Sequence, residues 1–326
     1  MTDMAKGRLA TVIGGSGFVG RYAVRALARD GWRVRAACRR PDLAGHLQPM
    51  GRVGQIHPVQ ANLRFKDSLI PAMRGAETVI TSVGVLAPTG PQTFDAIHVA
   101  GPRAAAKAAR EAGVTRFIHI SAIGADAQSK ARYARTKAAG EAAVLEEFPD
   151  AIILRPSIIF GPEDQFFNRF ASMARMSPLL PLIGGGKNRF QPVYVADLGD
   201  AIAAAAAGAG KPGTIYEAGG PQVLTFRELL DKTQLWAGRD RAYFPMPFWM
   251  AKLQAALTWP LPNGLRPITV DQVRMLQRDT VVSDAAIAEG RTLAAFGIEN
   301  PESIEAIVPT YLERFKAKGQ YAHYRG

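Results

Sequence analysis

The residues best suited to chemistry in this sequence are a tyrosine and a lysine four positions apart, Tyr133 and Lys137. In a helix this spacing places the phenol and the ammonium on one face. The ammonium can lower the phenol pKa, so that the tyrosine exchanges a proton with a substrate while a hydride is transferred. Such a pair also occurs by coincidence, and its meaning depends on whether a nicotinamide cofactor site accompanies it.

A glycine-rich turn supplies such a site directly after a predicted strand at 9–13. Gly14 permits a tight turn, Gly17 lets the backbone approach a pyrophosphate, and Gly20 lets the following helix lie against the strand. Free N–H groups at the helix N-terminus attract the phosphate. The alternative is a glycine-rich turn without a ligand. The predicted cofactor contacts in this turn are Gly14, Gly15, Ser16, Gly17, Phe18, Val19 and Gly20.

The end of the second predicted strand favours NADP(H) over NAD(H). An NAD site normally has an acidic residue here for the ribose hydroxyls, whereas this chain has Arg39 and Arg40. A guanidinium donates paired hydrogen bonds to a 2′-phosphate. The alternative is that one of the two arginines is only a solvated surface charge.

Two further strand ends are predicted to contact the cofactor. Asn62 and Leu63 follow the third strand and would reach the adenine edge, although Asn62 could instead cap the next helix. Ser82, Val83 and Gly84 end the fourth strand with a small turn that can pass over the cofactor.

These residues lie in an alternating pattern of strands and helices. Short β-branched segments alternate with alanine-rich helical segments, which predicts a parallel sheet covered on both faces. We therefore expect an α/β fold, a Rossmann-type doubly wound sheet with a smaller, mainly helical C-terminal region. The expected domains are 1–160 with 191–218 returning to it, and 161–190 with 219–326. The predicted strands are 9–13, 33–38, 53–59, 78–83, 116–121 and 151–155, and the helices 19–29, 66–73, 94–112 and 133–148.

Composition narrows the remaining function classes. The 326 residues are 48% hydrophobic and 21% charged, which excludes a disordered, collagen-like or coiled-coil chain. The single cysteine, Cys38, cannot form an internal disulfide, and the five histidines have no metal-ligand spacing, so no metal is expected. No signal peptide and no membrane span are apparent, which favours the cytoplasm.

The net charge of +12 is uneven along the chain. Residues 1–163 hold 22 basic and 13 acidic side chains, and residues 164–326 hold 18 and 15. A basic field favours anionic partners without selecting one, or serves only solubility. No zinc cluster or aromatic RNA-reading signature accompanies it, so nucleic acid is not expected.

The tyrosine and lysine, placed after the fifth strand of a chain with a dinucleotide turn, resemble the short-chain dehydrogenase/reductase superfamily. Segments 154–157, 160–162 and 193–197 resemble its extended, epimerase-like branch, which implies that Pro156, Ser157 and Ile158 lie on the nicotinamide side. Ser121 also belongs to the resemblance, but Ala122 aligns with the usual catalytic hydroxyl. A one-residue offset turns a strand side chain to the opposite face. Loss of such a donor costs roughly a hundredfold in rate.

A dinucleotide site with a weakened catalytic set resembles one atypical branch, the NAD(P)H-binding accessory subunits of respiratory complex I. The resemblance implies NADPH held as a structural ligand where the peripheral and membrane arms meet, near the quinone site. It also implies other complex I subunits as partners. For a bacterial version it implies a peripheral position on the cytoplasmic side of the inner membrane. The matching segments are 12–20 with Arg39 and Arg40, 117–124, 133–141, 154–164 and 166–171.

An apolar segment near the C-terminus has two interpretations. Residues 243–265 carry one charge, Lys252, and predict a helix that starts at Pro247 and ends before Pro260. With its basic flanks, the region 239–278 could contact anionic lipid or a membrane-arm subunit. It could equally be a core helix of the second domain or a lid.

Two other functions stay open. Tyr133 and Lys137 could serve an NADPH-dependent reductase or epimerase acting on a small or lipid-like carbonyl. A nucleotide sensor that binds macromolecules through its basic face is the third possibility.

Overall fold

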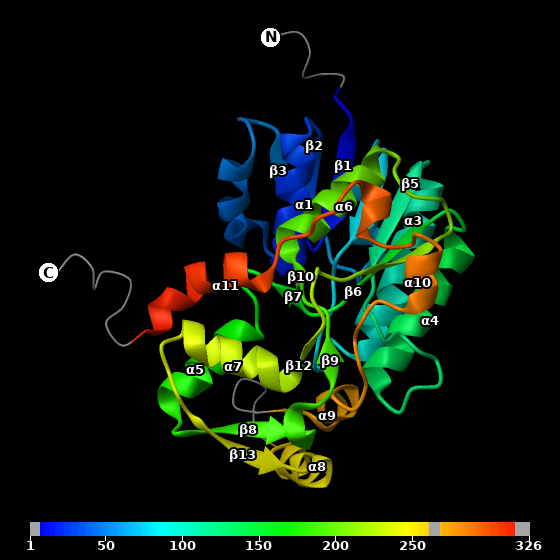
Figure 1. Cartoon of the computed structure of the whole chain (residues 1–326). Helices are drawn as coiled ribbons and strands as arrows, with labels where there is room; N and C mark the ends of the chain where they lie inside the picture. Colours follow the sequence, from blue (N-terminus) through cyan, green and yellow to red (C-terminus); the bar gives the residue numbers. More distant parts are fainter. Residues whose placement is uncertain (1–6, 261–267, 317–326) are drawn as a thin grey trace, which may run out of the picture. The chain divides into compact units, whose positions relative to one another are not determined.

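The computed structural model describes residues 7–260 and 268–316 and divides into two units (Figure 1). Unit 1 holds the chain up to Pro156 together with Val195–Ala218 and Val282–Glu299. Unit 2 holds Ser157–Tyr194, Gly219–Val281 and the chain from Asn300. Each unit has its own hydrophobic core.

Unit 1 is built on a seven-stranded sheet in which every pair of neighbours is parallel. The strand order reverses between the third and fourth strands of the sequence, which is the doubly wound arrangement. This confirms the expected Rossmann-type α/β fold. From edge to edge the strands are β3 (Ile56–Gln60), β2 (Arg33–Cys38), β1 (Leu9–Ile13), β4 (Thr78–Thr81), β5 (Arg116–Ile120), β6 (Ile152–Pro156) and β11 (Ile215–Ala218).

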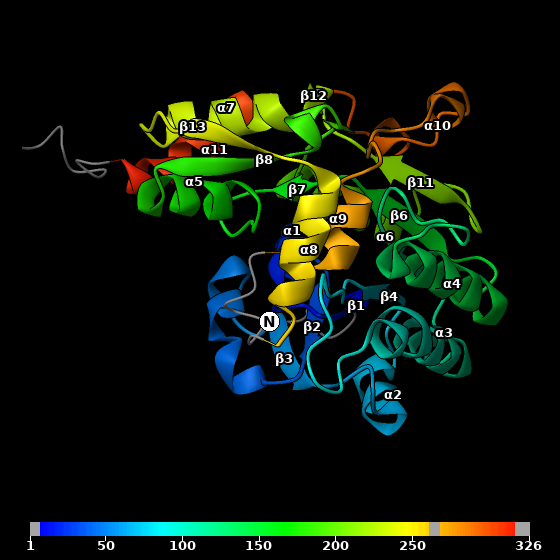
Figure 2. The same cartoon turned by 90° about the horizontal axis from the view of Figure 1, so that it is seen from below.

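Helices cover both faces of this sheet (Figure 2). One face carries α1 (Phe18–Arg29) and α6 (Val195–Ala207), which cross at Gly199, where an added Cβ would lie 2.9 Å from the Tyr22 backbone. The other face carries α2 (Leu69–Met73), α3 (Gly101–Glu111) and α4 (Arg132–Glu147) over a core rich in alanine. Short 3-10 turns lie at η2 (Pro41–Leu43), η3 (Gly45–Met50) and η4 (Lys66–Ser68).

Two boundaries differ from the sequence prediction for local reasons. The helix expected at 94–112 begins as a π-helix, η5 (Asp95–Ala100), and α4 packs closely against this segment, since a Cβ on Gly140 would lie 1.9 Å from the His98 carbonyl oxygen. The strand expected from residue 53 starts only at Ile56, because Val53 is exposed and Gly54 turns the chain with φ of 76°.

We expected all of residues 219–326 to belong to the second domain, but the structure places Val282–Glu299 in unit 1. This segment contains α10 (Asp284–Ala288) and η8 (Leu293–Phe296). The Ser283 N–H donates to the Glu217 carboxylate at 2.7 Å, and Phe296 packs edge-on against Tyr216. Contacts with residues of β11 thus hold Val282–Glu299 in unit 1, although the local sequence pattern predicts that this segment belongs to the second domain.

Unit 2 contains short strand pairs and helices around an aromatic core that includes Phe160, Phe167 and Phe226. The parallel pair β8 with β13 was not predicted, because prolines interrupt both strands. The strands are β7 (Ile159–Phe160), β8 (Leu179–Ile183), β9 (Arg189–Phe190), β10 (Val193–Tyr194), β12 (Leu224–Thr225) and β13 (Ala242–Met246). The helical segments are α5 (Phe167–Met176), η6 (Gly184–Gly186), α7 (Phe226–Trp236), α8 (Phe248–Leu257), α9 (Val270–Met275), α11 (Ile304–Leu312) and η9 (Glu313–Phe315).

No helix within residues 7–260 and 268–316 combines the length and the apolar character needed to cross a bilayer.

Candidate functional site

The glycine turn of unit 1 forms a tight cradle at the carboxyl end of β1. Gly14 has φ of 85°, a conformation that favours glycine, and its N–H donates to the Ala37 carbonyl at 2.8 Å. A Cβ on Gly14 would lie 2.8 Å from the Val83 side chain, and a Cβ on Gly20 would lie 2.1 Å from the Gly14 carbonyl oxygen. Both positions therefore require glycine for close approach.

Helix α1 begins directly after this glycine turn. Its N-cap, Gly17, offers no side chain to the first helical N–H groups, and the first turn contains no acidic residue. The backbone N–H groups of Phe18 and Val19, together with the positive end of the helix dipole, fit an anionic pyrophosphate. The Arg21 guanidinium donates to the carbonyls of Ser16 and Gly17, both at 3.3 Å.

Arg21 was missed by the sequence analysis. It brings a positive charge onto the turn that would hold the phosphates. The signal that could have revealed it is a first helical turn without acidic residues that is followed by a basic residue.

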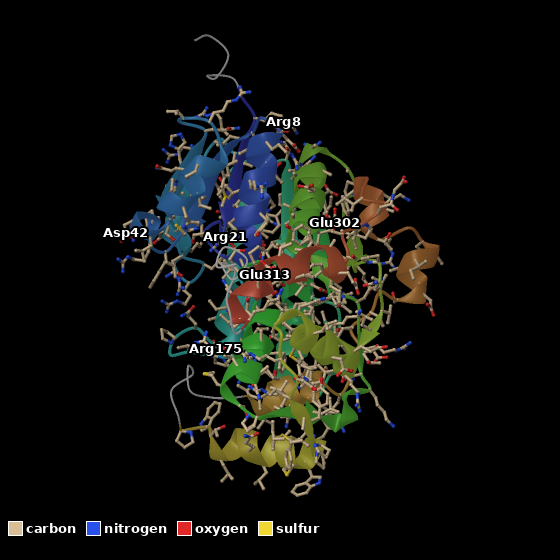
Figure 3. The ribbon with its side chains drawn as sticks, turned by 60° about the vertical axis from the view of Figure 1, so that its left-hand side comes forward. Arg8, Arg21, Asp42, Arg175, Glu302 and Glu313 are labelled. Carbon is tan, nitrogen blue, oxygen red and sulfur yellow. The ribbon has the colours of Figure 1, made fainter. Side chains whose placement is uncertain are left out.

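The two arginines after β2 have different surroundings. Arg40 donates to both carboxylate oxygens of Asp42 at 2.7–3.2 Å, and both side chains are exposed, as Figure 3 shows for Asp42 at the outer edge of the ribbon. Arg39 has no hydrogen bond or ion pair within the described part of the chain. The two arginines therefore differ in this structure, because Asp42 already engages Arg40.

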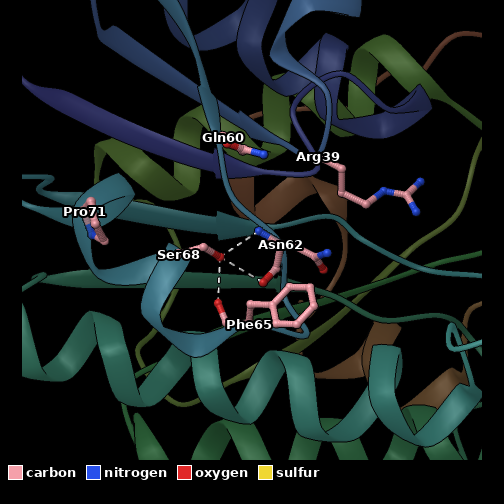
Figure 4. Close-up of a pocket in the computed structure, with 6 residues that line it drawn as sticks. All are labelled: Arg39, Gln60, Asn62, Phe65, Ser68 and Pro71. Atoms are coloured by element: carbon pink, nitrogen blue, oxygen red, sulfur yellow. Dashed lines mark hydrogen bonds between the residues drawn. The ribbon is translucent and has the colours of Figure 1, made fainter.

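Arg39 lines a pocket of about 380 Å³ together with the last residue of β3 and residues that follow it. In the view of Figure 4 the side chains of Arg39, Asn62 and Phe65 extend to the same side of the loops. The pocket is lined by Arg39, Gln60, Asn62, Phe65, Ser68 and Pro71. A guanidinium, an amide and an aromatic ring lie together after the carboxyl ends of β2 and β3. This combination suits a phosphorylated adenosine.

The residues after β3 divide between ligand and core. Asn62 Oδ1 accepts from the Arg64 N–H at 3.1 Å, and the Ser68 hydroxyl joins the Asn62 backbone at 2.9 and 3.1 Å. These bonds form a local turn rather than a helix cap, since α2 begins only at Leu69. The Leu63 side chain is buried in the core, so only its backbone can face an adenine.

The turn after β4 brings the cradle and the lysine together. The Ser82 hydroxyl donates to the Ile13 carbonyl at 3.0 Å, beside Gly14. A Cβ on Gly84 would lie 3.6 Å from Lys137 Nζ. Gly84 thus leaves open the space in front of the ammonium.

Helix α4 presents Tyr133 and Lys137 as its sequence predicted. Lys137 is 4% exposed, its Nζ donates to the Ile120 carbonyl at 3.2 Å, and it lies 6.0 Å from the Tyr133 ring centroid. Burial lowers the pKa of Lys137 to about 8, against the opposing effect of Glu141, and burial raises the pKa of Tyr133 to about 12. Tyr133 is therefore a neutral phenol at physiological pH, suited to donating a proton.

A buried histidine, whose role the sequence analysis did not anticipate, holds this tyrosine. His98 lies edge-on to the Tyr133 ring with centroids 5.2 Å apart, and Phe94 stacks on the imidazole and also contacts the Tyr133 ring edge-on. The Val85 N–H donates to His98 Nε2 at 3.2 Å, so Nδ1 carries the proton and donates to the Thr136 hydroxyl at 3.0 Å. Burial and the Lys137 charge lower the pKa of His98 to about 3.

The end of β5 bears on whether the site can polarise a carbonyl. Ser121 is 4% exposed, and its hydroxyl is buried without a hydrogen-bond partner among the described residues. Ala122 is half-buried, so the more accessible of the two positions carries only a methyl group. The nearby His119 is likewise buried and, among the described residues, bonds only through Nδ1, to Thr81 at 2.7 Å.

The remaining predicted residues lie where the chain leaves unit 1. Pro156 ends β6 and its carbonyl accepts from the Ile123 N–H at 2.9 Å. Ser157 and Ile158 belong to unit 2, where the Ser157 hydroxyl donates to the Thr280 carbonyl at 2.6 Å. The described residues contain no cluster of three or more potential metal ligands.

Comparison with known proteins agrees with this geometry. The profile of the NAD dependent epimerase/dehydratase family matches residues 10–219. The mitochondrial NADH dehydrogenase [ubiquinone] 1 alpha subcomplex subunit 9 of Arabidopsis thaliana is 38% identical over 292 residues, covering 86% of this chain and 72% of that protein. The mitochondrial 40 kDa subunit of NADH-ubiquinone oxidoreductase of Neurospora crassa is 29% identical over 320 residues, covering 97% and 81%.

A bacterial enzyme is also similar. The ceramide reductase of Caulobacter vibrioides is 37% identical over 197 residues, covering 60% of each protein. The NADPH-dependent quinone oxidoreductase of Escherichia coli, crystallised with NADPH, superposes with a TM-score of 0.71 at 21% identity, over 93% of this chain and 99% of that one. The last likeness concerns the fold alone.

With its dinucleotide cradle and these similarities, the chain belongs to the NAD dependent epimerase/dehydratase family and is homologous to subunits of respiratory NADH:ubiquinone oxidoreductase, complex I.

Proposed function

We propose that this chain is an accessory subunit of complex I and holds NADPH as a structural ligand where the peripheral and membrane arms meet. One observation carries the proposal: the dinucleotide cradle lies in the same unit as a β5 end at which Ala122, and not a hydroxyl, occupies the more accessible position. The homology to complex I subunits supports the assembly.

NADPH specificity in this proposal depends on Arg39. The open guanidinium lines the pocket beside Asn62 and would bind the 2′-phosphate, while Gly17 and the start of α1 would hold the pyrophosphate. A ligand present at a thousand times its Kd stabilises the folded state by about 4 kcal/mol. Bound NADPH would thereby order unit 1 for docking.

The proposed location is peripheral, on the cytoplasmic side of a bacterial inner membrane. The partners would be other complex I subunits, and the region 239–278 would supply the contact with the membrane side, either lipid or a membrane-arm subunit.

The test is purification of the membrane complex in mild detergent from cells with a tagged copy of this chain. We expect the chain to copurify with NADH:ubiquinone oxidoreductase activity and to release NADPH in near-equal amount on denaturation. An Arg39→Ala chain is the matched variant and should carry less NADPH. A tagged chain that is recovered without any complex I subunit would refute the proposal.

A second function is favoured by the Tyr133 and Lys137 geometry. Burying an ammonium is costly, and a purely structural site has no need of a lysine with a pKa near 8 beside a phenol. Bound NADPH would supply a hydride, Tyr133 would protonate the carbonyl oxygen, and Lys137 would orient the ribose. The similarity to a ceramide reductase suggests a lipid-like carbonyl as substrate.

This second function is tested by NADPH oxidation with a long-chain ketone dispersed in detergent. Turnover should fall about a hundredfold or more in Tyr133→Phe, because the proton donor is lost. A rate that is unaffected by this change, or no turnover with carbonyl compounds, leaves only the structural function.

A further inference from the structure

Helix α8 of unit 2 exposes three large apolar residues and buries two alanines. Trp249, Leu253 and Leu257 are 67%, 52% and 73% exposed, whereas Ala251 and Ala255 are buried. The three exposed residues are four positions apart and therefore share one helix face. We call Trp249, Leu253 and Leu257 the α8 patch. In Figure 3 side chains project outward from this yellow helix.

The orientation of α8 is fixed by its inner side. The Phe248 ring fills the space above Gly184, where an added Cβ would lie 2.1 Å from the ring. Ala251 joins Ile183 and Val273 in a small core. Rotating the helix to hide Trp249 would push large side chains into positions that fit alanine, so the exposure of the α8 patch is built into the packing.

The α8 patch differs from a random scatter of exposed apolar residues, because its three side chains share one helix face. Single exposed apolar residues are normal, but a contiguous apolar helix face marks an interaction surface. Trp259, also exposed, follows two residues after the helix ends, so indole rings lie near both ends of a helix about 15 Å long. Tryptophan near the ends of an apolar segment is characteristic of residues at a lipid headgroup boundary.

The charges around the helix indicate which surface it meets. Between Asp240 and Asp271 the sequence contains no acidic residue, and it contains three basic ones, Arg241, Lys252 and Arg266. Lys252 lies within α8 itself, at the border of the α8 patch, and is half-buried. A stretch of sequence that contains basic residues and no carboxylates complements anionic lipid headgroups.

We infer that the α8 patch inserts into the interface of a bilayer that contains anionic lipid, with α8 lying parallel to the membrane plane. The inference deepens the proposed membrane-side contact and commits it to lipid. It does not depend on NADPH.

The experiment measures flotation of the full chain with phosphatidylcholine vesicles, with and without 30 mol% (about one third) phosphatidylglycerol. We expect binding to the anionic vesicles, and Leu253→Glu should raise the lipid concentration for half-binding about tenfold or more. The matched control is Leu235→Glu on α7, because Leu235 is 72% exposed in the same unit but lies outside the α8 patch. Equal losses in the two variants, or no flotation of the unchanged chain, would overturn the inference.

A second readout locates the contact. Brominated lipids quench tryptophan fluorescence on contact, and Trp249→Phe keeps the apolar surface while removing one reporter. At lipid concentrations at which all of the protein is bound, this variant should lose much of the quenching, and unchanged quenching would contradict insertion through α8. If Leu253→Glu instead dissolves a dimer seen by light scattering, the patch joins two copies and the lipid assignment is wrong.

The outcome is separable from that of the proposed function. Unchanged circular dichroism and urea-unfolding midpoints of both glutamate variants show that they are folded. If the chain copurifies with complex I but does not bind vesicles, only the lipid contact is refuted. If it floats with anionic vesicles but copurifies with no complex I subunit, only the accessory role is refuted.

Discussion

Replacing Arg39 with alanine should weaken NADPH binding far more than replacing Arg40, although the two residues are neighbours. The reason is that Arg39 has no partner in the described structure and lines the pocket beside Asn62, whereas Arg40 already donates to both oxygens of Asp42. Only a guanidinium without a competing carboxylate is available at full strength to a 2′-phosphate.

The magnitude follows from the exposure of Arg39. A hydrogen bond to a charged group contributes about 1.5–3 kcal/mol, and about 1.4 kcal/mol corresponds to tenfold in Kd. Because Arg39 is exposed, solvent screens its attraction and the lower end of this range applies. We therefore expect Arg39→Ala to raise the Kd for NADPH about tenfold. Arg40→Ala should change it by less than about threefold.

Titration calorimetry with NADPH and NADH at two ionic strengths provides the assay. NADH lacks the 2′-phosphate, so its Kd should be nearly the same in all three proteins. The loss in Arg39→Ala should shrink at high salt, since screening weakens the attraction in the unchanged chain. If Arg40→Ala weakens NADPH binding as much as Arg39→Ala, or if NADH binding falls in parallel, the assignment of Arg39 to the 2′-phosphate is refuted.

Three further predictions concern the packing of each unit. Gly20→Ala places a Cβ 2.1 Å from the Gly14 carbonyl and should cost about 1–3 kcal/mol in urea unfolding and abolish NADPH binding, while Gly45→Ala, which meets nothing within 4 Å, should do neither. Burial lowers the pKa of both His98 and His119 to about 3. Between pH 6.5 and 3 the unfolded chain therefore takes up protons that the folded chain does not. The free energy of unfolding should fall by about 1.4 kcal/mol per histidine for each pH unit. Urea unfolding at pH 6.5 and 5.0 measures this loss, and an equal slope in a His98→Asn/His119→Asn chain would contradict it. Tyr311→Phe removes the 2.5 Å hydrogen bond to the buried Asp164 of unit 2 and should cost about 1–3 kcal/mol in unfolding without changing the Kd for NADPH; a parallel loss of NADPH affinity would count against this reasoning.

Local sequence predicted what depends on neighbouring residues. The glycine turn, the alternation of strands and helices, and the placement of Tyr133 and Lys137 on one face of a helix all follow from spacings of a few residues. These patterns were sufficient to predict the fold, which the structure confirms. They also predicted a helix after Pro247, which the structure forms as α8.

Contacts between distant segments decided the rest. His98 meets Thr136 from 38 positions away, Ser283 returns to Glu217 across 66, and the exposure of the α8 patch depends on how Phe248 seats on Gly184. Even the unequal roles of Arg39 and Arg40 depend on how the backbone directs two adjacent side chains after β2. The sequence by itself determined which elements form and which residues could bind a dinucleotide, because those choices rest on local conformation. The tertiary structure alone decided which charges are already paired and which apolar faces stay uncovered, because partners and cover come from parts of the chain that meet only when it folds.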